Sequence, residues 1–366
     1  MWLLAVGGCV EPYQANINSS ELNTLVVDGF YNTTDGTVTV NLSRSRPIGD
    51  KTPRPETGAT MFIEEEGGKS IKIFEAAAGV YSAVGIKLAP DKRCRIRMVA
   101  RSREYYSDFV TIQPTPVIDT VMWKPLTDGV GVVVSTHGPG TTGYYRWTYE
   151  ETWRYRSYFQ SYWIFKNHVP VYRTQDEQIW ECYTTLPSTK IAVASTTQLA
   201  ENRINEYELV FIPKDSRKIS SRYSILVRQM AITPEAYEYW KQLQKTTENL
   251  GGLFDPLPGQ ITGNIHGKTN PGEVVVGYFS ASGVTQQRIF FDFNDLPQYL
   301  KSSGFDGNCQ ESDMQPLTLV YTLEGAYNIT SAIYAGETIV GYHYSTFGCT
   351  DCRLEGGTLT KPLWWK

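Results

Sequence analysis

The chain has 366 residues, of which 20% are charged and 41% hydrophobic, and its formal net charge is −4. This length exceeds one ordinary hydrophobic core and predicts two or three domains. The charges form no basic block, which argues against nucleic acid as a partner. No apolar run approaches the roughly 20 residues of a membrane-spanning helix, so we expect the body of the protein to be soluble.

The composition indicates a β protein. Aromatic residues make up 13% of the chain, with 24 Tyr and 9 Trp, and there are 31 Gly. Such a composition, with little sign of helix, favours all-β domains. The predicted fold class is mainly β, with immunoglobulin-like or regulatory-type β-sandwich domains and one long α-helix inserted in the C-terminal region.

The N-terminus resembles a bacterial lipoprotein signal. Val6-Gly7-Gly8-Cys9 has the aliphatic residue, two small residues and cysteine that lipidation and signal cleavage require. We therefore predict a residual signal over 1–9, ending in the lipidated Cys9, and a polar tether over 10–21. The leader is short and has no Lys or Arg before Cys9, which points to a mis-assigned or trimmed start. The alternative is an ordinary apolar N-terminus with a chance cysteine.

Residues 22–113 are predicted to form an N-terminal β-sandwich domain. Short strands at 25–31 and 37–42 flank a loop that ends in Asp35-Gly36, a hairpin signal. The clearest strand is 93–100, in which arginines alternate with the apolar face. That face carries Cys94, Ile96, Met98 and Ala100.

Two prolines, Pro114 and Pro116, favour an extended linker and mark the boundary to a C-terminal, mainly-β region over 117–366. In this region Thr233 offers an N-cap and Pro234 a first helical residue. They predict a helix over about 234–250.

An aromatic segment over 144–165 is the candidate contact surface, because half of its residues are aromatic. It could form a stacking platform for a sugar or an extended peptide. The alternative is that its rings fill a sandwich core. The contact candidates are Trp147, Trp153, Tyr155, Tyr158, Tyr162 and Trp163.

The cysteines predict disulfides. With Cys9 lipidated and Cys94 in a core, four remain, which permit three connectivities. A zinc site would need a second close pair, and a redox pair would need a helix N-terminus. The disulfide candidates are Cys182, Cys309, Cys349 and Cys352.

No catalytic or metal-binding motif is present, and we expect neither enzymatic activity nor a cofactor. The four histidines are scattered, without an HExxH or GxSxG pattern. Glu150 and Glu151 are adjacent on a predicted strand, so they would point to opposite faces and could not share acid/base work.

Several motifs, weak singly, become specific in the order in which they occur. They are the lipobox at Cys9, LVVDG at 25–29, TVNLSRS at 39–45, TGATMFIEE at 57–65, YYRWTYEETW at 144–153, RYSILVRQMAITPEAYEYW at 222–240 and CTDCRLEGGTLTKPLWW at 349–365. With these motifs the chain resembles the envelope lipoproteins of Bacteroidota that are grouped as domain of unknown function 4249. The resemblance covers nearly the whole chain and carries no catalytic residues.

The resemblance implies a gene neighbourhood with TonB-dependent outer-membrane receptors. We therefore expect a surface-exposed outer-membrane lipoprotein, held in the bilayer by N-terminal acyl chains, that captures or gates a ligand for such a transporter. The aromatic segment and the cysteine-linked C-terminus are the expected contact surfaces. The alternative is an envelope adhesion protein that binds a glycan or a protein and transports nothing.

Overall fold

The computed structural model describes residues 23–46, 50, 52–248, 261, 263–302, 309–314 and 316–366. The predicted lipidation site at Cys9, the tether over 10–21 and the last two residues of the predicted helix over 234–250 lie outside this part of the chain.

The chain divides into two compact units. Unit 1 comprises Met1–Pro114 and Ile232–Gly283, and unit 2 comprises Thr115–Ala231 and Val284–Lys366. This division differs from the expected domains over 22–113 and 117–366, because the segment with the long helix returns to the first unit. The sequence boundary at Pro114 agrees with the end of the first segment.

Unit 1 is a strongly curved β-sheet with one helix. Its elements are β1 (Leu25–Asn32), β2 (Thr37–Arg44), β3 (Thr60–Glu65), β4 (Ser70–Ala77), β5 (Val80–Ala83), β6 (Arg93–Ala100), β7 (Arg103–Ser107), β8 (Val110–Thr111), α1 (Pro234–Glu248), β18 (Ile265–Gly267) and β19 (Val275–Ser282). The strand order is β18-β7-β6-β3-β4-β5-β2-β1-β19, with β8 beside β6. All described pairings are antiparallel except β1 with β19, which is parallel.

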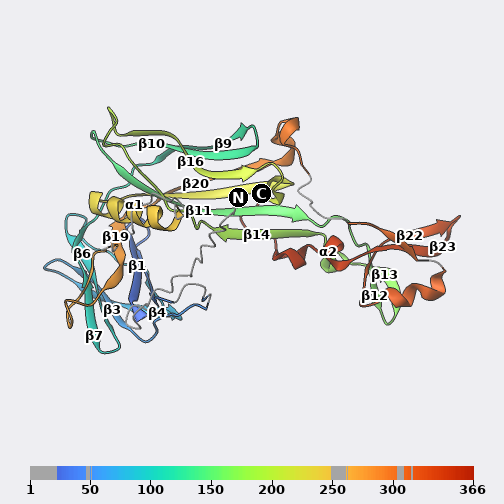
Figure 1. Ribbon diagram of the computed structural model, residues 1–366, viewed down its shortest axis with the longest axis horizontal. Coiled ribbons are helices and arrows are strands. Elements are labelled where there is room, and N and C mark those ends of the chain that lie inside the picture. Colours follow the sequence, from blue (N-terminus) through green and yellow to red (C-terminus); the bar gives the residue numbers. More distant parts are fainter. Residues whose placement is uncertain are drawn as a thin grey trace, which may run out of the picture. The chain divides into compact units, whose positions relative to one another are not determined.

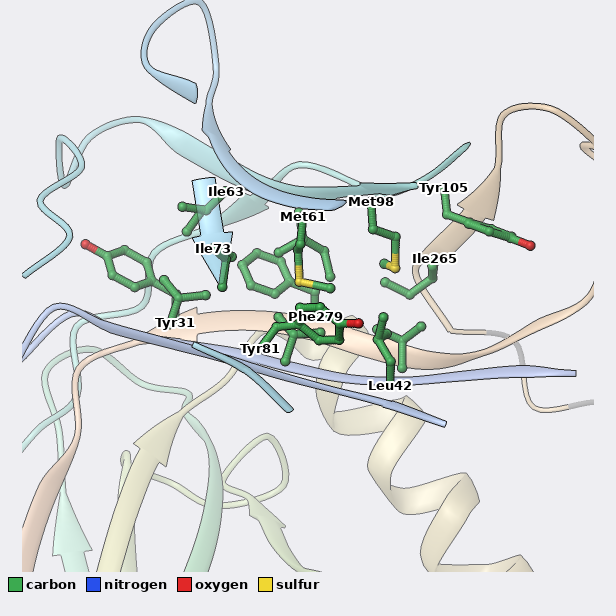
Figure 2. Packing of buried hydrophobic residues seen from close by; sticks show 14 of the residues in the cluster. Tyr31, Leu42, Met61, Ile63, Ile73, Tyr81, Met98, Tyr105, Ile265 and Phe279 are labelled. Carbon is green, nitrogen blue, oxygen red and sulfur yellow. The ribbon is translucent and has the colours of Figure 1, made fainter. Parts of the chain in front are cut away.

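The core of unit 1 lies between the two halves of this sheet. Figure 2 shows Met61, Ile63 and Met98 from one half meeting Leu42 and Phe279 from the other. Alternation puts every second side chain of β1, β2 and β6 into this core. Cys94 belongs to it, as predicted, and its burial raises the pKa of the thiol to about 12. The thiol therefore stays protonated at neutral pH.

Helix α1 begins where the sequence predicts. The hydroxyl of Thr233 accepts a hydrogen bond from the Ala236 amide, at 3.2 Å, and so caps the first turn. Ala236 and Trp240 are buried, and the ring of Tyr239 lies 5.0 Å from that of Tyr278 in β19. The apolar stripe of the helix therefore packs against unit 1.

Unit 2 contains a two-layer β-sandwich. Its strands are β9 (Ile118–Leu126), β10 (Gly129–His137), β11 (Tyr144–Arg156), β14 (Glu181–Pro187), β15 (Ala192–Ser195), β16 (Arg203–Pro213), β17 (Arg222–Ala231) and β20 (Thr285–Asp292). One layer has the order β16-β10-β9 and the other β14-β11-β17-β20, with β15 beside β11. Short 3-10 helices are η3 (Arg217–Ile219), η4 (Phe293–Asp295) and η5 (Gln298–Leu300).

The remainder of unit 2 is a smaller body that we call the disulfide lobe, defined as the described residues of 157–180 and 309–357. It contains β12 (Trp163–Lys166), β13 (Val169–Tyr172), η2 (Gln175–Glu177), β21 (Ser312–Met314), η6 (Leu317–Leu323), β22 (Asn328–Ala335), β23 (Thr338–Ser345), α2 (Phe347–Thr350) and η7 (Cys352–Glu355). Strands β12 and β13 form a hairpin, and β12 lies beside β22 (Figure 1). The expected mainly-β class, with sandwich domains and one long helix, is confirmed.

Candidate ligand-binding site

The disulfide lobe contains a cavity of ≈ 440 Å³, which we call the lobe pocket. This volume falls within the roughly 300–1,000 Å³ of small-molecule sites, which are mostly apolar with a few polar groups. The apolar lining residues are Trp163, Ile164, Phe165, Ile179, Tyr327, Ile329, Phe347 and Leu354. The polar side chains that line it are Arg173, Glu324, Asn328, Asp351 and Arg353.

The aromatic wall of the pocket is fixed by packing inside the lobe. The ring of Trp163 lies 4.0 Å from that of Tyr172 and 5.1 Å from that of Tyr342. Trp163 is only 7% exposed and shares a small core with Leu323 and Ile329. A ring held on several sides presents a rigid apolar face, which reduces the entropy lost on binding.

Arg173 crosses the base of the lobe and is held by three neutral acceptors. Its Nε donates to the Ser161 hydroxyl, Nη1 to the Glu177 carbonyl oxygen and Nη2 to Asn328 Oδ1, each at 3.1 Å. Burial lowers the pKa of Arg173, because the charged guanidinium loses water. The residue is thus a partly buried cation that lines the pocket.

The other charged groups of the pocket are paired. The Arg353 guanidinium makes two hydrogen bonds to Asp351, at 2.9 and 2.7 Å, and the Arg353 amide makes a third, at 3.0 Å. Burial raises the pKa of Asp351, but these bonds outweigh it and contribute to holding the pKa below its usual value. Glu324 Oε2 lies 2.6 Å from His168 Nδ1 in the β12–β13 turn. The pocket lining therefore combines apolar side chains with paired charged groups.

Two disulfides join all four predicted cysteines: Cys309–Cys349 lies within the disulfide lobe, and Cys182–Cys352 links the lobe to β14 of the sandwich. They close loops with sequence separations of 170 and 40 residues. Each bridge is expected to stabilise the fold by roughly 2–5 kcal/mol, mainly by restricting the unfolded chain. The disulfide prediction is confirmed. The structure selects one of the three pairings that the spacing of the cysteines left open.

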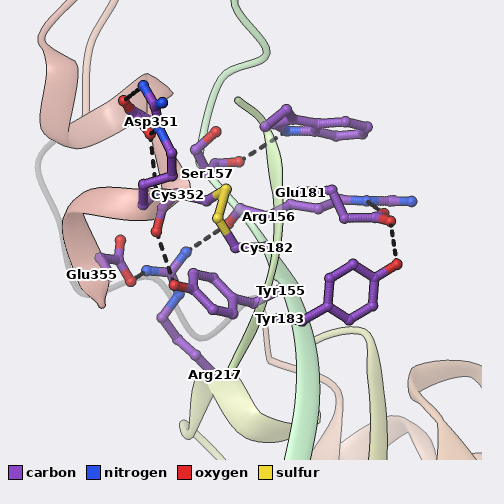
Figure 3. The surroundings of a disulfide bond; sticks show 12 residues. Tyr155, Arg156, Ser157, Glu181, Cys182, Tyr183, Arg217, Asp351, Cys352 and Glu355 are labelled. Atoms are coloured by element: carbon purple, nitrogen blue, oxygen red, sulfur yellow. Dashed lines mark hydrogen bonds and ion pairs between the residues drawn. A yellow bond between two sulfur atoms is a disulfide. The ribbon is translucent and has the colours of Figure 1, made fainter. Parts of the chain in front are cut away.

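The Cys182–Cys352 bridge fixes the C-terminal segment to β14, and β11 adds noncovalent contacts to the same segment. The Tyr155 hydroxyl donates to the carbonyl oxygen of Cys352, at 2.8 Å, and the guanidinium of Arg217 lies over the Tyr155 ring (Figure 3). Arg217 is also ion-paired with Glu355. The C-terminal wall of the pocket is therefore tied to the sandwich by a covalent bond, a hydrogen bond and an ion pair.

The predicted contact residues separate into buried and exposed groups. Trp147 and Tyr155 are buried, so their prediction as contact residues is wrong: alternation turns Trp147 into the sandwich core and Tyr155 under the disulfide. Trp163 is buried too, but it lines the pocket. Trp153 is partly buried beneath the Lys218 ammonium. The alternative interpretation, that the rings fill a core, therefore holds for most of β11.

Tyr158 and Tyr162 remain exposed, at 45% each, because β11 has ended and no second sheet covers them. Neither lines the lobe pocket. No sequence motif marks Arg173, Tyr327 or Phe347, which the fold brings together from distant segments. The only signal pointing to this region was the predicted role of the aromatic segment and the cysteine-linked C-terminus, and the pocket combines both.

A family model for a domain of unknown function (DUF4249) matches residues 10–288. The chain belongs to this family. The resemblance is thereby confirmed at the level of the domain family, and the DUF4249 match ends before the C-terminal wall of the lobe pocket. A search of curated proteins finds no significant relative.

Two solved structures show weak similarity to the DUF4249 chain. The chicken interferon gamma receptor alpha chain has 9% identity and a TM-score of 0.16, over 57% of this chain and 90% of that one. The adhesin InvE of Yersinia pseudotuberculosis has 15% identity and a TM-score of 0.16, over 58% and 56%. Scores this low support no argument about function.

Within the described ranges of the DUF4249 chain, no helix has both the length and the apolar character needed to cross a membrane. The same residues contain no group of three or more His, Cys, Asp or Glu that could hold a metal ion. The two disulfides fit an extracytoplasmic protein, since such bonds persist in oxidising compartments.

Proposed function

We propose that this DUF4249 protein is a lipid-anchored binding protein of the outer-membrane surface, which captures a ligand as the accessory subunit of a TonB-dependent transporter. The lobe pocket carries the binding role, because a mostly apolar cavity with a few polar groups is typical of small-molecule sites. The disulfides support a location outside the cytoplasm. We propose binding rather than catalysis, without a cofactor.

The anchor and the transporter partner rest on the sequence. The pattern that ends at Cys9 supports lipidation, and the family resemblance supports a TonB-dependent receptor as partner. Each buried methylene of an acyl chain contributes about 0.8 kcal/mol, so several chains would hold the protein at the bilayer without a spanning helix.

Replacing Cys9 with alanine tests the anchor. We expect the wild-type protein to sediment with outer membranes and to require detergent for extraction, whereas Cys9→Ala appears in the soluble fraction at full length. The matched control is Cys94→Ala, which removes a thiol from a core and should leave fractionation unchanged. Mass spectrometry of the wild type should show acyl chains on Cys9. A wild-type protein without acyl chains, found free in the soluble fraction, would remove the anchor from the proposal.

Purification in mild detergent tests the transporter partner. We expect a tagged DUF4249 protein to bring down a β-barrel receptor in stoichiometric amount. Three exposed tyrosines of the lobe, Tyr172, Tyr321 and Tyr334, favour the second candidate function, adhesion to a protein or glycan. A monomer that recovers no barrel and binds glycans on an array would establish adhesion and exclude the transporter role.

A further inference from the structure

The charge of Arg173 is the feature of the lobe pocket that the fold leaves unmatched. Three of the five N–H donors of its guanidinium bond to neutral oxygens, which leaves two donors. Among the described residues no carboxylate oxygen lies within 4.0 Å of the Arg173 guanidinium. Glu177 and Asp351 attract its charge only from a longer distance. Partly buried cations are usually paired, because their loss of hydration needs compensation.

The nearby carboxylates compensate this charge only in part, because Glu177 and Asp351 act on Arg173 without forming an ion pair with it. Asp351 is hydrogen-bonded to Arg353, and Glu324 is paired with His168. The pocket lining holds two arginines and two carboxylates, and both carboxylates have partners of their own. Glu177, which lies outside the lining, is paired with Lys166. The region around Arg173 therefore favours one additional negative charge.

The rest of the cavity sets the kind of molecule that brings this charge. Trp163, Phe165, Ile329 and Phe347 line it with rings and branched aliphatic chains. Burial of apolar surface against such walls contributes roughly 25 cal/mol per Å². A ligand that satisfies both features has an apolar body and a single anionic end.

We propose that the lobe pocket binds a small monoanionic carboxylic acid, with its carboxylate on Arg173 and its apolar body against Trp163 and Phe347. The inference rests on the proposed binding function and gives its ligand a chemical class. Arg173 is well suited to this role, because a guanidinium held in place by three hydrogen bonds keeps its planar fork ready for a carboxylate.

A monoanion is favoured over a phosphate. Asp351 and Glu324 also line the cavity, and both would repel a second negative charge on the ligand. One carboxylate matches the single unpaired cation, whereas a phosphate dianion would leave an excess charge in a partly apolar site.

Isothermal titration of the full-length protein with two matched probes tests the proposal. The probes are 3-phenylpropionate and its neutral amide, 3-phenylpropionamide, and phenyl phosphate serves as the dianionic comparison. We expect the acid to bind about ten- to hundredfold more tightly than the amide, the range that a hydrogen bond to a charged group supplies. The phosphate should bind more weakly than the acid.

A second experiment tests whether the acid binds in the lobe pocket. It leaves Arg173 in place, because the three hydrogen bonds of that side chain also hold the lobe together. Leu354 lines the pocket and is 62% exposed, so Leu354→Glu adds a negative charge at the site with little loss of packing. We expect it to weaken binding of the acid severalfold in low salt, with the amide unaffected. Leu363, which is fully exposed and not part of the pocket lining, is the matched control, and Leu363→Glu should bind both probes as the wild type does.

Four results would overturn the proposal: no binding of the acid at millimolar concentrations, equal binding of acid and amide, tighter binding of phenyl phosphate, or Leu354→Glu and Leu363→Glu affecting the acid equally. These outcomes are separable from failure of the proposed function. Binding of the acid by a protein without anchor or receptor would leave the pocket assignment standing. An anchored, receptor-bound protein that ignores the acid would refute only the ligand class.

Discussion

Replacing Gly277 with alanine is expected to disrupt unit 1, at a cost of more than about 4 kcal/mol, the range reserved for severe backbone or core damage. Gly277 lies in β19 opposite Val27 of β1 and has φ +148°, a conformation that L side chains rarely adopt. A Cβ at this position would overlap the carbonyl oxygen of Val27. The two backbones approach too closely for any side chain to fit between them.

Hydrogen exchange followed by mass spectrometry provides the measurement. In Gly277→Ala we expect amides of β1 and β19 to lose protection, while the β11 and β17 amides of unit 2 keep theirs. Gly58→Ala is the matched control, because Gly58 also has a positive φ, +71°, but has open space around the added Cβ. It should cost only about 1–2 kcal/mol of backbone strain. Unchanged protection of β1 in Gly277→Ala would show that the parallel pairing is wrong.

Glu151→Ala is expected to destabilise the sandwich of unit 2 by about 3–5 kcal/mol, because it leaves buried polar partners without a counter-charge. The Glu151 side chain lies inside the sandwich, where Lys218 Nζ contacts both carboxylate oxygens at 2.9 and 2.8 Å. The hydroxyl of fully buried Tyr223 donates to the same carboxylate at 2.7 Å, and burial raises the pKa of that phenol well above its ordinary value. The phenol therefore remains a donor at all physiological pH values.

The neighbouring residue gives a matched control. Glu150 points to the opposite face of β11 and pairs with Arg288 at 3.3 Å near the surface, so Glu150→Ala should cost less than about 1 kcal/mol. A double variant, Glu151→Ala with Tyr223→Phe, should lose less than the sum of the two single variants, since no hydroxyl is left unpaired. Chemical unfolding with exchange of the β11 and β17 amides measures all three. Equal losses for Glu150→Ala and Glu151→Ala would contradict the buried network.

The same pair of glutamates shows what local pattern can establish. Adjacent strand residues point to opposite faces, so the sequence alone predicts that Glu150 and Glu151 lie on opposite faces of β11, and their separate partners confirm this placement. The alternation of Tyr145, Trp147 and Tyr149 is equally local. The sequence of β11 does not contain the information about which of its two faces a second sheet covers. For this reason the prediction of Trp147 as a contact residue is wrong, and the residue lies in the core.

The lobe pocket was beyond prediction from sequence for a related reason. Its cation, Arg173, carries no motif, and its partners Ser161 and Asn328 lie 12 and 155 residues away along the chain. The cysteines indicated that distant parts of unit 2 are joined, but four cysteines allow three pairings, and only the packed structure selects one.

By itself the sequence determined the mainly-β class, the position of many strands, the capped start of α1, the buried Cys94 and the presence of disulfides. These features depend on side-chain periodicity and capping, which act over a few residues. The tertiary structure decided that β19 returns to pair with β1, that the segment with α1 belongs to unit 1, and that an arginine faces an apolar cavity in the lobe. Those outcomes depend on two opposing terms: the free energy gained when distant apolar surfaces are buried together, and the entropy lost when long loops are closed. Neither term can be evaluated from a short stretch of sequence.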